Sequence, residues 1–233
     1  MEDGTSVAIT MKPVQVVFLE GVHGVGKTTL LEALEKEGYY TIPEGFSIGD
    51  VSVEDYVLRA HLGHNFACEL EWVGRLFRRL YEAVVKYQIG DLDLKDSLIF
   101  VDRSFVTAMV YGKLDDPLAA TSYVQLCRMM WNQLEEFGTR MLIVYLHRPD
   151  PEAHWQKICE RLEREPQRAR LGEGERSWMN LCIARYNALH KDVHMLGYEL
   201  KDNYSGRTKE TARQLIRFTR TAFRLLDWAR DRE

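Results

Sequence analysis

A continuous apolar run followed by a glycine-rich turn most constrains what this chain can fold into. Residues 14–19 are apolar apart from Gln15, which suits a strand that is buried on both faces. The next segment, Gly21-Val22-His23-Gly24-Val25-Gly26-Lys27-Thr28, fits G-x-x-x-x-G-K-[ST] without a mismatch. A helical pattern runs from residue 28 to 37, and Gly38 ends it. A glycine turn between a buried strand and a helix predicts an α/β fold.

Each fixed position of this turn, a P-loop, has a role in binding phosphate. Glycines let successive backbone N–H groups point into one concavity at a helix N-terminus, where the helix dipole favours anions. Lys27 brings a positive charge to the β- and γ-phosphates of a nucleoside triphosphate, and the Thr28 hydroxyl can bind magnesium. We expect His23, at a variable position, to face solvent. The residues predicted to bind ATP and Mg²⁺ are Gly21, Val22, His23, Gly24, Val25, Gly26, Lys27, Thr28 and Thr29.

Length and composition exclude several classes of protein. The 233 residues are 45% hydrophobic, which is enough to bury the core of one α/β domain. A net charge of −4 argues against bulk nucleic-acid binding. No apolar run approaches the ~18 residues of a membrane helix, and four scattered cysteines suit reduced thiols in a cytoplasmic protein. We expect residues 1–12 to be a disordered tail and residues 13–233 to be a single domain.

The rest of the chain alternates short apolar runs with helical periodicities. This alternation predicts a three-layer α/β domain, in which a parallel sheet of about five strands has helices on both faces. The further strands are expected at 39–42, 98–101, 141–146 and 198–200. The further helices are expected at 66–87, 118–137, 151–164, 175–196 and 207–230. Residues 165–174 contain proline and glycine and form a loop that is dense in arginine.

Signatures of several other nucleotide-binding classes are absent from the sequence. A signalling GTPase should carry N-K-x-D and D-x-x-G, and a transporter-type ATPase should carry an L-S-G-G-Q-like segment. A helicase or a large ring ATPase would need a longer chain. The remaining class is that of small kinases, which move the γ-phosphoryl group of ATP to a small acceptor.

Two segments resemble thymidylate kinases and deoxynucleoside kinases. Phe18-Leu19-Glu20-Gly21 leads into the P-loop as it does in these families. Asp102-Arg103-Ser104-Phe105-Val106-Thr107, followed by Val110-Tyr111, is similar to the D-R-[YF] segment of the first family and the E-R-S segment of the second. The resemblance covers most of the chain in order. It implies a P-loop kinase fold with an arginine-rich lid at about 161–176, and transfer from ATP to a nucleoside or nucleoside monophosphate.

The sequence also departs from both families. Pro43-Glu44-Gly45 stands where thymidylate kinases carry E-P-G. Phe66-Ala67-Cys68-Glu69 stands where deoxynucleoside kinases carry a Phe-Gln pair that reads the base. The base-reading residues therefore cannot be transferred, and the choice of acceptor stays open. Members of these families often form dimers, so a homodimer is possible.

Carboxylates and an arginine are expected at the ends of the second and third strands. By resemblance, Glu44 lies beside the acceptor hydroxyl and could act as its general base; for a monophosphate it would only organise water or an arginine. Asp102 ends a buried strand and needs a cation, for which magnesium is the obvious partner. Arg103 can clamp phosphate or carboxylate bidentately. The alternative for Glu44 is a surface glutamate without a role in the site. The alternative for Asp102 and Arg103 is a purely structural pair.

Arginines around the loop at 165–174 are expected to close over the transferring phosphate. Arg164 and Arg168 are the leading choices for catalysis, beside Arg161 and Arg170. The alternative is a solvated helix end, whose arginines are neutralised by neighbouring glutamates.

Residues of the helix at 66–87 could contact the acceptor. The resemblance implies that Arg75 points toward it, and Trp72 could stack on a base or belong to the core. By resemblance, residues 203–206 would lie at the adenine of ATP. Two rival functions remain: a kinase for another small metabolite, and a nucleotide-binding regulatory module without transfer activity.

Overall fold

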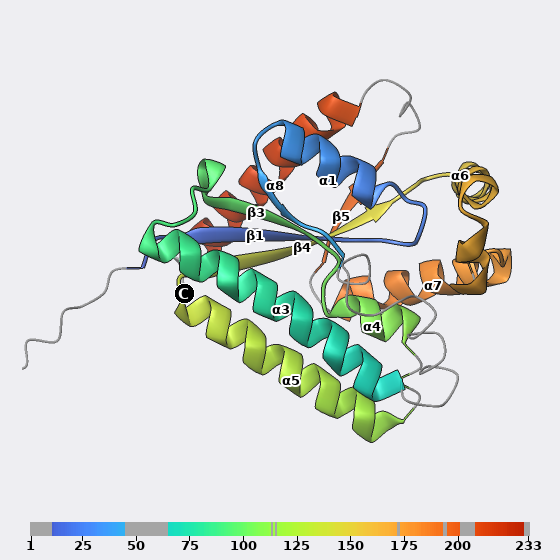
Figure 1. Ribbon diagram of the computed structural model, residues 1–233, viewed down its shortest axis with the longest axis horizontal. Coiled ribbons are helices and arrows are strands. Elements are labelled where there is room, and N and C mark those ends of the chain that lie inside the picture. The colour runs from blue at the N-terminus through green and yellow to red at the C-terminus, as the bar shows by residue number, and fades with distance from the viewer. Residues whose placement is uncertain are drawn as a thin grey trace, which may run out of the picture.

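A five-stranded parallel sheet runs through the molecule (Figure 1). In the computed structural model, the described residues are 11–44, 65–112, 114, 116–171, 173–192, 195–200 and 208–230. The strands are β1 (Val14–Glu20), β2 (Tyr40–Ile42), β3 (Leu98–Asp102), β4 (Thr139–His147) and β5 (Leu196–Glu199), in the spatial order β2-β3-β1-β4-β5. All four pairings are parallel, so the carboxyl ends of the strands meet at one edge of the sheet.

Helices cover both faces of this sheet (Figure 1). On one face lie α1 (Lys27–Lys36) and α8 (Thr208–Arg230). On the other lie α3 (Asn65–Ile89), α4 (Val106–Tyr111), α5 (Pro117–Glu136) and α7 (Arg176–Asp192). The helix α6 (Pro151–Arg164) lies beyond the carboxyl ends of the strands, and short 3₁₀ turns form η2 (Lys95–Ser97) and η3 (Pro166–Leu171). The predicted three-layer α/β fold is confirmed.

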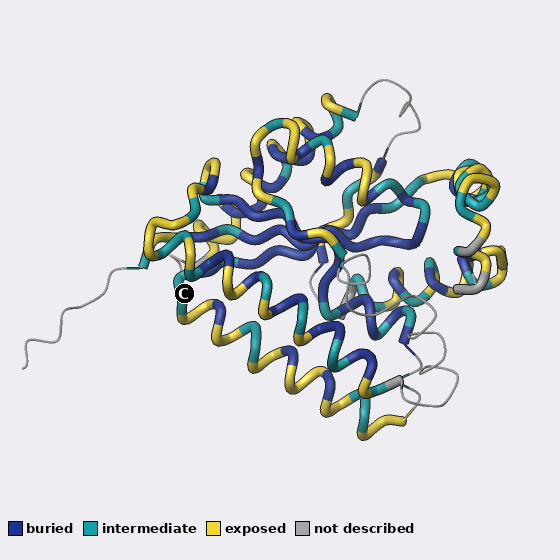
Figure 2. Tube along the Cα trace, in the orientation of Figure 1, coloured by how far each residue is buried: buried dark blue, intermediate teal, exposed yellow. Residues whose placement is uncertain are grey.

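The side chains of β1 divide the core into two halves. Val16 and Phe18 pack with α3, α5 and α7, whereas Val17 and Leu19 pack with α1 and α8. Figure 2 shows the buried strands between helices whose outer faces are exposed. A strand that is buried on both faces has no need for alternating polar residues, which explains the continuous apolar run in the sequence.

The end of α7 differs from the sequence-based expectation. A helix was predicted over 175–196 and a strand over 198–200, but α7 ends at Asp192 and β5 begins at Leu196. The apolar spacing of the helix continues to Leu196 in the sequence, yet this residue pairs with Val144 of the neighbouring strand β4. Backbone pairing along the sheet overrides the helical pattern here.

Several other expectations concern the surface. Of the predicted tail, only Met11 and Lys12 are described, and the Lys12 N–H donates to Gln88 Oε1 at 2.8 Å. The basic residues of α8 are mostly paired with acids: Arg213 lies 3.6 Å from Glu37, and Arg220 pairs with Asp96.

No helix in the described part of the chain is long and apolar enough to span a membrane. All four cysteines are described, and no disulfide joins them.

Candidate active site

The glycine turn between β1 and α1 curls tightly at the carboxyl edge of the sheet. Gly21 has φ 147°, and a Cβ at this position would lie 2.6 Å from the Leu146 carbonyl oxygen. Gly24 has φ 73°, and its Cβ would lie 2.6 Å from Ile158 on α6. A side chain at either position would collide with neighbouring structure, so glycine is required for the close approach of this loop to β4 and α6.

The first turn of α1 is arranged to receive an anion. Its N-cap is Gly26, with φ 113° and no side chain that caps the helix, and no acidic residue lies in the first turn. The unsatisfied N–H groups of such a turn and the helix dipole favour phosphate. Thr28 and Thr29, also in this turn, are exposed. This is the arrangement that the sequence predicts for the donor site.

Lys27 folds back across the P-loop. Its Nζ donates to the Gly21 carbonyl oxygen at 2.7 Å and lies 3.4 Å from that of Val22. Burial, together with the nearby Arg103, lowers the pKa of Lys27 to about 8, against the opposing effect of Asp102. A phosphate group would restore the preference for the charged form.

Asp102 fits the predicted magnesium site. It ends β3, is only 3% exposed, and its Oδ1 has no hydrogen-bond partner among the described residues. Burial raises the pKa of Asp102 above its usual value, although Lys27 opposes this shift. An unpartnered buried carboxylate oxygen is the kind of hard oxygen ligand that Mg²⁺ prefers.

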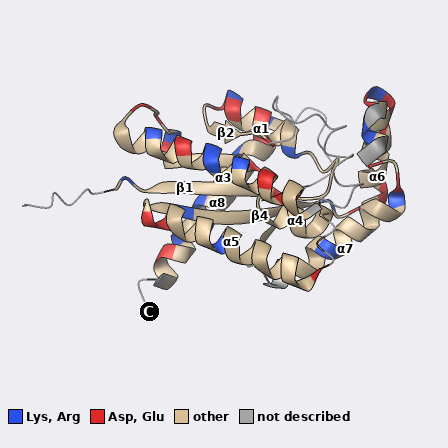
Figure 3. Ribbon diagram, turned by 60° about the horizontal axis from the view of Figure 1, so that its bottom comes forward, with Lys and Arg blue, Asp and Glu red and all other residues tan. Residues whose placement is uncertain are grey.

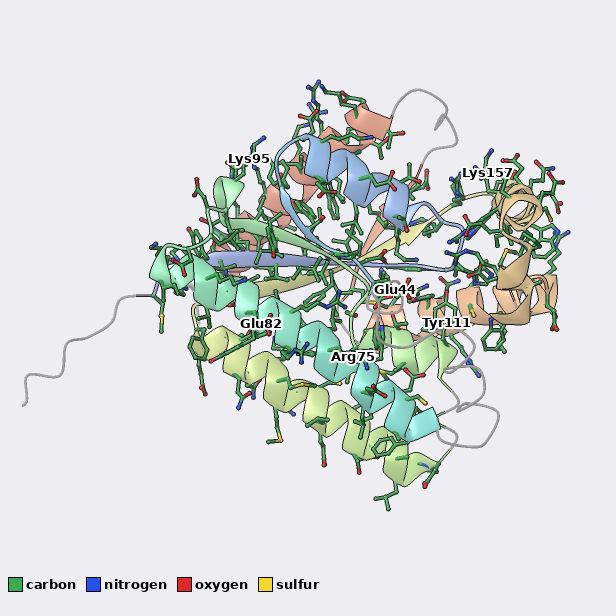
Figure 4. All side chains as sticks on the ribbon, in the orientation of Figure 1. Glu44, Arg75, Glu82, Lys95, Tyr111 and Lys157 are labelled. Carbon is green, nitrogen blue, oxygen red and sulfur yellow. The ribbon has the colours of Figure 1, made fainter. Side chains whose placement is uncertain are left out.

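Arg103 and Glu44 form an ion pair beside the P-loop. The Arg103 Nε lies 2.5 Å from Glu44 Oε1, and the guanidinium stacks over the Tyr111 ring at 4.8 Å. Figure 4 shows Glu44 near the carboxyl end of the sheet, close to Tyr111 on α4. Burial opposes the charge on Arg103, but Glu44 raises the pKa of Arg103 well above its usual value. Glu44 thus pairs with an arginine, which is one of the roles that the resemblance implies for it.

The backbone of Arg103 adopts the left-handed conformation, with φ 71°. Such a conformation costs a non-glycine residue about 1–3 kcal/mol and is concentrated at functional sites. The Arg103 N–H donates to the Leu19 carbonyl oxygen at 3.0 Å, which ties the segment after β3 to β1. The strained backbone therefore directs the guanidinium toward the space beside the P-loop.

Glu20 organises the segments around the site and was not among the predicted site residues. It is fully buried, and its Oε1 accepts from both the N–H and the hydroxyl of Ser104 at 2.6 Å. Thr107 donates to it at 3.0 Å, and the Tyr186 hydroxyl donates to Oε2 at 2.7 Å. One carboxylate thus joins β1, the turn after β3, α4 and α7. The resemblance of both segments to the same kinases was the only signal for this in the sequence.

His23 contradicts the expectation of a solvent-facing residue, since it is only 3% exposed. Its N–H donates to the Tyr111 hydroxyl at 2.9 Å, and its carbonyl oxygen accepts from His154 Nε2 at 2.9 Å. Burial lowers the pKa of His23 to about 3, with a smaller contribution from Arg103. Tertiary contacts from α4 and α6 bury a residue that the P-loop pattern leaves variable.

Side chains of α3 make contacts within the helix, in the core and with the segment that ends in Glu44. Arg75 pairs with Glu71 on the same helix, whereas Arg79 donates to the Pro43 carbonyl oxygen at 3.1 Å and holds the segment that ends in Glu44. Trp72 is 3% exposed and belongs to the hydrophobic core, which was the alternative to base stacking.

The lid arginines divide into two groups. Arg161 is half-buried, lies 3.8 Å from Glu173, and is close enough to Glu44 and His23 to influence the charge of this site. Arg164 is exposed, and its Nε donates to the Glu160 carbonyl oxygen of the same helix. Figure 3 shows residues of both charges close together around α6. Arg161 is therefore the more buried of the two arginines of α6, and it lies near Glu173.

Arg168, the other leading choice, is held by acids of the lid. It pairs with Glu165 and lies 3.2 Å from Glu173, a glutamate that is 8% exposed. The side chain of Arg170 and the residues 203–206 lie outside the described part of the structure. Their predicted roles stay predictions.

A comparison with known protein families identifies the family of this chain. Residues 16–194 match the model of an AAA domain family, which is well over half of the chain. The chain belongs to this AAA domain family. No curated protein sequence matches it.

Solved structures show which fold this AAA domain has. Deoxyadenosine kinase from M. mycoides with bound dATP is 14% identical, with a TM-score of 0.56 over 89% of this chain and 100% of that chain. The same kinase with products dCMP and a flexible dCDP is 14% identical, with a TM-score of 0.53 over 88% of this chain and 99% of that chain. At this identity the likeness shows the fold, and it confirms the predicted P-loop kinase fold.

A cleft of about 470 Å³ lies beside the P-loop in this AAA domain. It is lined by Val22 and Val25 of the loop, by the end of β4, and by residues of α6, α7 and β5. Lys27, Asp102 and Arg103 do not line it. The cleft is therefore lined by other residues than these charged groups of the candidate site.

The affinity of the AAA domain for ATP should fall as the pH rises above about 8. The pKa of Lys27 is about 8 in the free site, and phosphate favours the charged form, so binding above this pH must take up a proton. Calorimetric titration at about pH 9 in two buffers of different ionisation enthalpy should show uptake approaching one proton. In Lys27→Arg, whose guanidinium stays charged, the uptake should vanish. Equal uptake in both proteins would contradict the assignment to Lys27.

Proposed function

We propose that the chain transfers the γ-phosphoryl group of ATP, with Mg²⁺, to a nucleoside or a nucleoside monophosphate. The observation that carries this proposal is the ion pair between the buried Arg103 and the partly exposed Glu44, close to Lys27 and Asp102. A protein that only binds nucleotide has no need for a second charged site at this place. The strained backbone of Arg103 also favours a functional role for it.

The donor side of the proposed reaction uses the P-loop. The backbone N–H groups at the start of α1 bind the phosphates, and the Lys27 ammonium exchanges its bond to the Gly21 carbonyl for the β- and γ-phosphate oxygens. Thr28 and Asp102, the latter through water, would hold magnesium. The bound ion supplies charge neutralisation at the transferring phosphate oxygens.

The acceptor side uses the pair that is described above. With a nucleoside, Glu44 accepts the proton of the attacking hydroxyl, while Arg103 orients the carboxylate. With a monophosphate, which needs no strong base, Arg103 binds the acceptor phosphate and Glu44 holds the guanidinium. Both versions place the acceptor at the carboxyl ends of β2 and β3, where ligands bind in sheets of this kind.

Among the lid arginines, Arg161→Ala should lower kcat by about 10²- to 10³-fold, because a guanidinium that faces the transferring phosphate stabilises its charge. Arg164→Ala is the matched control on the same helix and should change kcat less than about threefold, because its side chain is exposed. Steady-state kinetics of both variants with ATP and the preferred acceptor test this. Equal losses, or a larger loss in Arg164→Ala, would restore Arg164 as the essential lid residue.

The function itself is tested by measuring ADP release against a panel of nucleosides and nucleoside monophosphates, with Lys27→Ala as the blank. Turnover on a nucleoside makes Glu44 the expected base, and turnover only on monophosphates shifts the emphasis to Arg103. ATP binding without turnover on any acceptor would overturn the proposal. It would favour a kinase for another metabolite or a regulatory module without transfer activity.

A homodimer is a further proposal that follows from the family resemblance. Leu118, Leu126 and Met129 on α5 are exposed. Their side chains give this helix an apolar outer surface that a second copy of the chain could cover.

A further inference from the structure

The helix α6 has two buried residues, and both contact the P-loop. All fourteen residues of α6 are described, and only His154 and Ile158 are buried. A Cβ on Gly24 would lie 2.6 Å from Ile158 Cγ1, and His154 Nε2 lies 2.9 Å from the His23 carbonyl oxygen. The helix lies beyond the carboxyl ends of the strands rather than on a face of the sheet (Figure 1). These two side chains therefore place α6 relative to the P-loop.

The hydrogen bond of His154 is the polar part of this contact. A carbonyl oxygen only accepts, so the Nε2 atom of His154 carries the proton. Burial lowers the pKa of His154, although its bond to His23 opposes this shift, and the ring is therefore neutral at neutral pH. An apolar side chain of similar size would fill the same space but would leave the His23 carbonyl without this donor. The imidazole thus serves the contact with the loop.

Arg161 lies on the same face of α6 as these two residues. It follows His154 by seven positions and Ile158 by three, and residues at i, i+4 and i+7 share one face of a helix. Its side chain is 25% exposed, whereas that of Arg164 is classed with the exposed surface. Burial lowers the pKa of Arg161, whereas Glu173 and, more weakly, Glu44 raise it. The charge of Arg161 is thus within electrostatic reach of the candidate site.

The acids around Arg161 neutralise its charge without fixing its position. Its Nε lies 3.8 Å from Glu165 Oε2, and its Nη1 lies 3.8 Å from Glu173 Oε2. Both distances are longer than a direct hydrogen bond. The position of the guanidinium in the free protein therefore depends on the position of α6 itself, which the contacts of His154 and Ile158 determine.

We propose that His154 is a positioning residue, whose hydrogen bond to the P-loop sets the distance between Arg161 and the transferring phosphate. This inference rests on the proposed function. The P-loop binds the phosphates and α6 carries the arginine, so a bond between the two keeps the donor and the lid charge in register. A misplacement of about 1 Å in a group that stabilises the transition state lowers the rate by about 10²-fold. His154 would thus affect the rate of transfer without contacting either substrate.

His154→Leu should lower kcat by about 10- to 100-fold, because it keeps most of the side-chain bulk but removes the donor. The Kd for ATP should stay within about threefold, since the N–H groups of the P-loop and Lys27 still bind the phosphates. His154→Gln, which carries an N–H donor at a similar reach, should recover part of the loss. Steady-state kinetics with the acceptor that the wild type uses gives kcat, and calorimetric titration gives the Kd for ATP.

A double-mutant cycle with Arg161 separates this role from a merely structural one. In the Arg161→Ala protein, His154→Leu should lower kcat less than about threefold, because the group that it positions is gone. In the Arg164→Ala protein, the same change should cost as much as in the wild type. An equal loss in the Arg161→Ala protein and in the wild type would overturn the proposal, and would show that His154 acts on the P-loop or on the fold as a whole.

Ile158→Val tests the apolar half of the same contact in a variant that should fold, because it removes only one methylene group from a buried side chain. Its kcat should fall about two- to fivefold in the wild-type background and should not fall further in the Arg161→Ala protein. Unchanged kcat in both His154→Leu and Ile158→Val, while the wild type turns over, would overturn the proposal and leave the proposed function intact. No turnover by the wild type on any acceptor would overturn the proposed function, and this inference with it.

Discussion

Lys27→Ala should lower kcat/KM for phosphoryl transfer by about 10³-fold or more, which corresponds to roughly 4 kcal/mol of transition-state stabilisation. The Lys27 Nζ is the mobile cation of the P-loop, and in the free protein it donates hydrogen bonds to the carbonyl oxygens of Gly21 and Val22. Its charge acts on the oxygens of the transferring phosphate in a site with little water, where electrostatic interactions are strong.

The same change should leave the fold intact. Burial disfavours the charge of Lys27, so its removal costs little folding free energy, and the Tm should fall by no more than a few degrees. Lys36→Ala, an exposed lysine on the same helix, is the matched control and should keep full activity. Activity within about tenfold of wild type in a folded Lys27→Ala protein would contradict the assigned role of the P-loop.

Glu20→Ala should lower the free energy of unfolding by about 3–5 kcal/mol. The substitution removes the acceptor of hydrogen bonds from Ser104, Thr107 and Tyr186, all of which are inaccessible or nearly so to water. These donors would be left unsatisfied around a new cavity. Chemical denaturation, followed by fluorescence and circular dichroism, measures the loss.

Two control variants accompany Glu20→Ala. Glu20→Gln keeps one acceptor oxygen, and the Tyr186 hydroxyl can turn to accept from the new amide, so the loss should be about half as large or less. Glu32→Ala, an exposed acid on α1, should change stability by less than about 0.5 kcal/mol. If Glu20→Ala were no more destabilising than Glu32→Ala, the carboxylate would not hold these segments together.

The layers of the fold and the donor site follow from local patterns. The run at 14–19 and the glycine turn after it predict a buried strand, a phosphate-binding loop and a helix, because all three signals lie within one short segment. The structure has β1, the uncapped start of α1 and Lys27 in these places. Local sequence patterns of this kind determine the local structure with little dependence on the rest of the chain.

The environment of the site could not be predicted because it depends on residues that are far apart in the sequence. Glu20 bonds to Ser104 and Tyr186, which are 84 and 166 positions away. His23 is covered by contacts with Tyr111 and His154, at separations of 88 and 131 positions. Apart from the family resemblance of the two segments that contain Glu20 and Ser104, a single sequence contains no signal for such pairs.

The direction in which the arginine side chains of α6 point could not be predicted from the sequence either. Arg161 and Arg164 are three residues apart on α6, and the density of arginine there made both plausible. The structure turns Arg161 toward Glu173, and it leaves Arg164 exposed. Which face of α6 lies against the P-loop is fixed by His154 and Ile158, which pack under Gly24.

The most direct test of the central claim follows the γ-phosphoryl group itself. Phosphorus NMR of the protein with Mg²⁺, ATP and each acceptor of the panel distinguishes a new phosphate ester or diphosphate from inorganic phosphate. We predict that the γ-phosphate signal is replaced by ADP and a phosphorylated acceptor in equal amounts, and that Lys27→Ala shows no conversion. Release of inorganic phosphate alone, at a rate that no acceptor changes, would contradict phosphoryl transfer and show an ATPase instead.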